Sequence, residues 1–187
     1  EIYIDMIPVT DYITSGVWQI ILNPTRVVEG QYDLWLPSEN VLNRGTGFLY
    51  PDEEVTLTIP STADKVISVG AYDALTFSYA SFSGRGYTWQ DERTKPDLVA
   101  PGVNVRTTAV GGGVTVVSGT SFATPFVTGA SALLMEWGIV RGNDPFLYGE
   151  KVKAYLRRGA RELPGFGKYP NREVGYGRLC LERSLPD

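Results

Sequence analysis

The pattern of apolar and polar positions changes character near residue 60. Before that point, three short runs are apolar or alternate between apolar and polar residues, and Gly, Pro, Asn and Ser bound them: GVWQIILN (16–23), GQYDLWLP (30–37) and EEVTLTIP (53–60). Such runs predict antiparallel strands of a β-sandwich. Three strands are too few to close a sandwich, so we expect the remaining strands to precede Glu1.

Beyond residue 60 the apolar runs become nearly continuous. They are KVISVGAY (65–72), DLVAPGVNVRT (97–107) and VTVVSG (114–119). Continuous apolar runs are typical of strands that are buried on both faces of a parallel sheet. Three consecutive glycines, 111–113, precede the third run and predict a turn.

Two amphipathic helices are expected after these strands. In the first, apolar residues repeat with helical spacing, and we expect Gly138 to end it. Its predicted buried face consists of Ala123, Phe126, Val127, Ala130, Leu133, Leu134 and Trp137. The second helix is predicted over 148–164, with Val152, Tyr155 and Leu156 on one face. Arginines near its C-terminal end suit the negative pole of a helix dipole.

Composition narrows the class of protein. The 187 residues are 43% hydrophobic, which fits one large domain or one domain with part of a second. The net charge of −4 is scattered, which argues against a nucleic-acid partner. We expect no membrane span, because no uninterrupted apolar run reaches about eighteen residues.

A single cysteine and no histidine argue against a disulfide or a transition-metal site. The start at Glu1, without an initiator methionine or a signal peptide, predicts a chain that begins within a longer or processed protein.

Ser121 stands out because of where it falls. The string VSGTSFATP (117–125) places it between a predicted strand and a predicted helix. The first amides of a helix lack partners within the helix, and the positive end of its dipole lies behind them. A serine oxygen held there would attack beside ready donors, and its own N–H can bind an oxyanion. The alternative is that Ser121 or Thr120 is only a helix N-cap.

The wider string decides between these interpretations. GTSFATPFVTGASALL (119–134) resembles the nucleophile motif of the subtilisin-like serine proteases, the subtilases, written G-T-S-x-A-x-P-H-V-x-G. Phe126 replaces the histidine of that motif. This motif histidine is a helix residue and is not the catalytic base. Three more blocks resemble the family in its own order: KVISVGAYD with YASFSGRG (65–73, 79–86), KPDLVAPG (95–102) and GYGRLCL (175–181).

This resemblance covers about residues 62–182 and implies a fold and a site. Residues 61–187 would be the C-terminal part of a subtilase catalytic domain, an α/β fold built on a parallel sheet. Ser121 would be the catalytic nucleophile of a serine endopeptidase acting on a protein or peptide substrate. Gly119 and Thr120 would lie near the oxyanion or the substrate.

A narrower resemblance concerns LLMEWGIVRGNDPFLYGEKVKAYLRRGAR (133–161) and GYGRLCLERSLP (175–186). Both are similar to a clostridial branch of the family that includes the Csp-type germination proteases. In that branch a jelly-roll-like β domain is inserted between the His and Ser segments, which implies that residues 1–60 are the C-terminal part of such an insert. The same likeness implies a bacterial, spore-associated or exported setting and a spore-germination zymogen as substrate.

The resemblance also shows what this stretch lacks. In subtilases the triad Asp, the triad His and the oxyanion-hole Asn all precede the insert, and their motifs do not occur here. A serine without a base is a poor nucleophile. We therefore expect this chain to be inactive alone and to need the N-terminal portion of the same protein. A Ser–Lys dyad with Lys65, Lys95 or Lys151 is the alternative, although each lysine is interpreted as a solvated flank.

Other functions stay open at this stage. The chain could be a non-catalytic scaffold with a subtilase fold, or a binding module centred on the β segment. Trp18, Trp35 and Tyr50 would then form a sugar or peptide surface, whereas core packing is their simpler interpretation. Exposed sheet edges predict a homo-oligomer, a swapped assembly or a retained partner fragment. Carboxylates could bind Ca²⁺, but no EF-hand spacing occurs, so no metal ligand and no cofactor are assigned.

Overall fold

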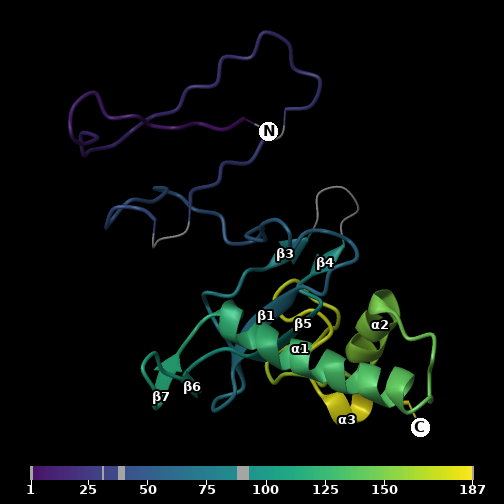
Figure 1. Ribbon diagram of the computed structural model, residues 1–187. Coiled ribbons are helices and arrows are strands. Elements are labelled where there is room, and N and C mark those ends of the chain that lie inside the picture. The colour runs from purple at the N-terminus through teal and green to yellow at the C-terminus, as the bar shows by residue number, and fades with distance from the viewer. Residues whose placement is uncertain (1, 31, 38–40, 88–92, 187) are drawn as a thin grey trace. The chain divides into compact units, whose positions relative to one another are not determined.

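The structure is a computed structural model that describes residues 2–30, 32–37, 41–87 and 93–186 (Figure 1). It divides into two compact units, Glu1–Phe48 and Leu49–Asp187. The boundary lies ahead of the one expected after residue 60, because the intervening segment bonds to the second unit. The Thr56 amide donates to the Arg85 carbonyl at 3.0 Å, and the Arg85 guanidinium lies 2.9 Å from the Glu53 carboxylate.

The first unit differs from the expected sandwich strands. Its described residues form no helix and no strand, and nearly all of them are exposed, Trp18 and Trp35 included. The run at 53–60, in the second unit, forms no strand either, and residue 31 of the run at 30–37 lies outside the described part. The physical reason is that a strand needs a neighbour for its backbone groups, and a few strands without a full sheet are at best marginally stable.

A small mixed sheet forms the centre of the second unit. Strand β1 (Val69–Asp73) lies between β2 (Ser78–Tyr79), which is antiparallel to it, and β5 (Leu98–Pro101), which is parallel. The far side of β5 bonds to the segment at 177–179, where the Leu179 amide donates to the Val99 carbonyl at 2.8 Å. The α/β class and the parallel β1–β5 pair are therefore as expected, but β2 makes the sheet mixed instead of wholly parallel.

The remaining strands form two hairpins. β3 (Gly86–Tyr87) pairs with β4 (Thr94–Lys95), and β6 (Val105–Thr108) pairs with β7 (Val114–Val117). The single strand predicted over 97–107 is therefore two strands, β5 and β6, because the chain turns after Gly102. The glycine turn at 111–113 is confirmed, and all three glycines have positive φ angles that other residues rarely adopt.

Helix α1 (Thr120–Met135) packs across β1 and β5 (Figure 1). Its buried residues are Ala123, Val127, Ala130 and Leu134, as the periodicity predicted. Phe126 and Leu133 are 43% and 53% exposed, so the predicted buried face was too wide. Gly138 does not end the helix, because the chain continues in a π-helical turn, Glu136–Val140. A Cβ on Gly138 would lie 2.8 Å from the Leu147 side chain, so glycine is needed there for packing.

Two more helices complete the second unit. α2 (Gly149–Gly159) buries Val152 and Leu156 as expected, and α3 (Leu181–Ser184) packs against it. α2 ends earlier than the predicted residue 164. Gly159 fits closely against Ser184, and the next residue, Ala160, leaves the helical conformation so that the chain can bridge to Arg178.

One helical stretch among the described residues, Thr120–Val140, is long and apolar enough to cross a membrane, with a mean hydropathy of 1.2. A core helix of a domain in water passes the same test, and α1 buries one face against the sheet. The absence of a membrane span therefore stays a prediction.

The contact between β5 and α1 yields the first testable prediction. A Cβ on Gly102 would lie 2.6 Å from the Ala71 Cβ and 3.1 Å from the Gly119 carbonyl oxygen. Gly102→Ala is therefore expected to lower the free energy of unfolding by about 1–3 kcal/mol through overpacking. Gly129→Ala is the matched control, because α1 leaves open space there. It should raise stability by up to about 1 kcal/mol. Urea unfolding measures both changes, and equal stabilities for the two variants would contradict the packing argument.

Candidate active site

The carboxyl ends of the two parallel strands hold the start of α1. The Gly102 amide, directly after β5, donates to the Tyr72 carbonyl in β1 at 3.0 Å. The Gly102 carbonyl accepts a bond of 2.8 Å from the Gly119 amide. Gly119 is the N-cap residue of α1 and has a φ of 152°, a conformation that favours glycine. The position of the first helical turn is therefore set by the sheet through two backbone hydrogen bonds.

Ser121 lies in that first turn and is exposed. Within the part of the chain that the structure describes, its hydroxyl has no hydrogen-bond partner. Neither Ser121 nor Thr120 is the N-cap residue, since Gly119 occupies that position without a side-chain capping bond. The capping interpretation of Ser121 is therefore wrong. Once a base takes its proton, a serine oxygen held at a helix N-terminus can attack a carbonyl carbon, and the unpaired amides there can donate to the resulting oxyanion.

An open cleft of about 290 Å³ lies beside the Ser121 side chain. One side of it is the first turn of α1, which contributes Thr120, Ser121 and Thr124. The other side is the segment at 60–69, here called the cleft wall, which contributes Pro60, Ser61, Val66, Ile67, Ser68 and Val69. These lining residues carry no charge. Gly119 does not line the cleft, but as the N-cap residue it fixes the start of the helical side.

The three lysines considered as bases all face carboxylates. Lys65 is largely exposed and lies 3.9 Å from Glu150, and Lys151 pairs with Asp144. Lys95 is 1% exposed and its Nζ lies 3.1 Å from Asp97 Oδ2. The interpretation of Lys95 as a solvated flank is therefore wrong. Among the described residues, no lysine is bonded to Ser121, so these lysines do not form a Ser–Lys dyad with it.

A buried group of charges lies behind the cleft wall. Asp97 is fully buried, and three cations meet its carboxylate from β4 and α2. Oδ2 accepts from Lys95 at 3.1 Å, whereas Oδ1 accepts from Arg157 Nε at 3.0 Å and lies 3.4 Å from Lys153 Nζ. We call Lys95, Asp97, Lys153 and Arg157 the Asp97 cluster.

Two pKa values in this cluster, those of Asp97 and Lys153, are shifted by burial and by neighbouring charges and hydrogen bonds. Burial raises the pKa of Asp97, but hydrogen bonds from the Ser68 amide and Arg157, with the charge of Lys95, outweigh it and bring the pKa below its ordinary value. Burial lowers the pKa of Lys153 to about 8; Asp97 opposes this shift, whereas Lys95 and Arg157 add to it. The lowered pKa of Asp97 favours its anionic form, and the pKa of Lys153 is low for a lysine.

The Asp97 cluster bonds directly to the cleft wall. Lys95 Nζ donates to the carbonyls of Ala63 at 3.3 Å and Val66 at 3.2 Å. Lys153 Nζ donates to the carbonyls of Asp64 at 2.7 Å and Val66 at 2.9 Å. This role of Lys95 and Lys153 was not predicted from the sequence. The available signal was the pair of charges in KPDLVAPG (95–102), which stand directly before a buried apolar run and need partners there.

Comparison with known proteins shows which family this chain resembles in sequence. The profile of the family described as Subtilase family matches residues 49–177. The mouse membrane-bound transcription factor site-1 protease is 39% identical over 134 residues, which cover 69% of this chain and 12% of that protein. Serine protease AprX of Bacillus subtilis is 34% identical over 156 residues, which cover 73% of this chain and 33% of AprX.

A solved structure is similar as well. The CspB protease of Clostridium perfringens superposes with a TM-score of 0.73 at 50% sequence identity. The superposition covers 77% of this chain and 30% of the CspB chain. The chain therefore spans a third or less of these three proteins.

The buried carboxylate of Asp97 gives a stability prediction. Asp97→Asn would leave two buried lysines and the partly buried Arg157 without their shared anion, and the free energy of unfolding is expected to fall by about 3–5 kcal/mol. Glu182→Gln is the control, since its carboxylate is 84% exposed and pairs with Arg161 at the surface. That change should cost at most about 1 kcal/mol. Thermal unfolding of both variants tests this, and a cost for Asp97→Asn as small as the control would contradict it.

The low pKa of Lys153 gives a prediction about pH. Its pKa is about 8 in the folded chain and 10.5 ordinarily, so between these values the folded state binds fewer protons than the unfolded state. The contribution of Lys153 to the free energy of unfolding must then rise with pH from about 8 and level off above 10.5. Urea unfolding from pH 7 to 10 should show this rise in the wild type relative to Lys153→Met. A relative fall would contradict it.

Proposed function

Because this chain belongs to the subtilase family, we propose that it carries the nucleophile of a serine endopeptidase and that Ser121 is that nucleophile. The observation that carries the proposal is the exposed Ser121 hydroxyl, which has no partner among the described residues and lines an open cleft at the N-terminus of α1. The substrate is a protein or peptide chain, whose backbone passes beside Thr120 and over the glycine-capped helix start.

The chemistry follows from the position of that hydroxyl. Ser121 Oγ attacks the scissile carbonyl carbon while a histidine takes its proton, which gives a tetrahedral oxyanion. The Ser121 amide donates one hydrogen bond to this oxyanion. The intermediate collapses to an acyl-enzyme when the histidine returns the proton to the leaving amine. Water then attacks the ester, the carboxylic acid leaves, and Ser121 regains its proton.

The histidine must come from outside these residues, since the chain contains none. The lysines considered as alternatives face carboxylates. The relatives are also longer than this chain, which spans 33% of AprX and 30% of CspB. We therefore assign the triad Asp and His and the second oxyanion donor to an N-terminal portion of the same protein. That portion would also cover the exposed flank of α1.

Of residues 1–60, we propose that the first unit, residues 1–48, belongs to an inserted jelly-roll-like β domain, whereas residues 49–60 go with the subtilase domain. Two observations support this. The family profile begins at residue 49, and the exposed apolar residues of the first unit include Trp18 and Trp35, which need a partner surface. The similarity to CspB of Clostridium perfringens supports a bacterial setting, and we propose a spore-germination zymogen as the substrate.

A labelling experiment tests this proposal. The isolated chain should react with a fluorophosphonate no faster than its Ser121→Ala variant, because loss of a triad member typically costs about 10⁴- to 10⁶-fold in turnover. The full-length protein should be labelled rapidly at Ser121 and should cleave casein. Rapid labelling of the isolated chain would show that it contains its own base. A full-length protein that is neither labelled nor active would instead be a non-catalytic scaffold.

A further inference from the structure

The cleft wall needs an external support. Residues 60–66 form only turns and bends, residues 67 and 68 have no regular secondary structure, and β1 begins at Val69. A segment without regular structure has few backbone hydrogen bonds of its own, so its position depends on whatever bonds it receives. This matters here because the wall faces Ser121 across the cleft.

The Asp97 cluster supplies those bonds. The ammonium groups of Lys95 and Lys153 together donate to three wall carbonyls, those of Ala63, Asp64 and Val66. At the end of the wall, the Ser68 amide donates to Asp97 Oδ2 at 2.6 Å and the Ser68 carbonyl accepts from the Asp97 amide at 2.8 Å. All of these bonds reach the wall through its backbone atoms.

Strand β5 connects this support to the nucleophile. Asp97 stands directly before β5, and Gly102 stands directly after it. Gly102 is bonded to Gly119 at the start of α1. The two sides of the cleft are thus held at opposite ends of β5. The cleft wall is bonded to Asp97 at one end, and the helix start that carries Ser121 is bonded to Gly102 at the other.

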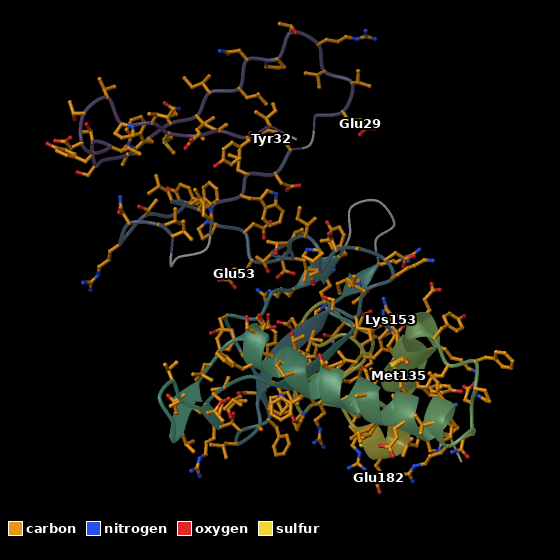
Figure 2. All side chains as sticks on the ribbon, in the orientation of Figure 1. Glu29, Tyr32, Glu53, Met135, Lys153 and Glu182 are labelled. Carbon is orange, nitrogen blue, oxygen red and sulfur yellow. The ribbon has the colours of Figure 1, made fainter. Side chains whose placement is uncertain are left out.

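Lys153 differs from Lys95 in the element that carries it. Lys95 belongs to β4, only two residues from Asp97, whereas Lys153 projects from α2 (Figure 2). Its two bonds to the wall, at 2.7 and 2.9 Å, are shorter than those of Lys95. The charged groups around it are Asp97, Lys95 and Arg157. A neutral amine still has two N–H donors, so these bonds do not require the charge.

We propose that Lys153 is a positioning residue, which acts through the carbonyls of Asp64 and Val66 to hold the cleft wall at the distance from Ser121 that a bound polypeptide requires. This inference rests on the proposed endopeptidase function. Lys153 touches neither the substrate nor the reacting atoms. It ties α2, a helix remote from the chemistry, to the surface on which the substrate lies.

Substitutions at two lysines of α2 test this role in the full-length protein. Lys153→Met removes the wall bonds. Lys151→Met is the matched control, because its ammonium pairs with Asp144 and does not touch the wall. We expect kcat/KM for a peptide substrate to fall about 10- to 100-fold in Lys153→Met, since a displacement of about 1 Å can cost 10²-fold. Lys151→Met should stay within about twofold of the wild type, and Lys153→Arg should recover much of the loss.

A second readout separates positioning from general destabilisation. A small fluorophosphonate does not need the cleft wall, so its rate of reaction with Ser121 should fall much less than peptide hydrolysis in Lys153→Met. Equal losses in both reactions would overturn the proposal. If Lys153→Met does not fold, Lys153→Gln takes its place, because its amide keeps a donor for one carbonyl and should give an intermediate loss.

Hydrogen exchange in the same full-length variants makes the test independent of activity. The amides of Ala63, Ser68 and Asp97, which are hydrogen-bonded within the wall or between the wall and Asp97, should exchange at least several-fold faster in Lys153→Met than in Lys151→Met or the wild type. Unchanged exchange would overturn the positioning role. If the wild type proves inactive while exchange still rises in Lys153→Met, the proposed function fails and the support of the wall by Lys153 stands.

Discussion

The interaction on which the second unit depends most is that of the buried carboxylate of Asp97 with the cations around it. Burying a charge is costly unless it is paired and hydrogen-bonded, and this one accepts from a backbone amide, a lysine and an arginine. Its partners come from β4, α2 and the segment before β1. One side chain therefore joins elements that are far apart in sequence, and the site inherits its geometry from that junction.

Such a junction is a poor source of net stability, since apolar side chains of the same volume often do as well. Its value lies in specificity, because charged groups tolerate only arrangements in which each finds its partner. Lys95 and Lys153 meet this demand by bonding to backbone carbonyls as well as to Asp97. The same bonds give an irregular segment a defined position opposite Ser121.

Much of the second unit could be predicted from sequence. Apolar runs identified β1, β5 and β7, and helical spacing identified α1 and most of its buried face, because burial imposes those periods directly. The limits were equally physical. A turn inside an apolar run, after Gly102, leaves the pattern unbroken and hides the division into β5 and β6. Gly138 carries a stop signal in sequence, yet it is a packing residue whose neighbour, Leu147, lies outside the helix.

The site was predictable only in part. The position of Ser121 followed from a motif, and the structure adds an exposed hydroxyl in a cleft. The Asp97 cluster could not be assembled from sequence, because Lys153 and Arg157 on α2 carry no local sign of a partner 56 and 60 positions earlier. In the first unit the sequence predicted strands that the structure does not show. Alternation of apolar and polar residues favours a strand, but a strand also needs a neighbouring strand to bond with.

The hydrogen bond between Gly102 and Gly119 has a wider consequence. It closes a loop whose interior, residues 103–118, contains the hairpin of β6 and β7. Because the two ends are clamped together at the sheet, that hairpin is an appendage whose length can vary at small entropic cost. Longer or shorter hairpins can therefore replace this one and change the surroundings of Ser121, while the position of Ser121 itself stays fixed.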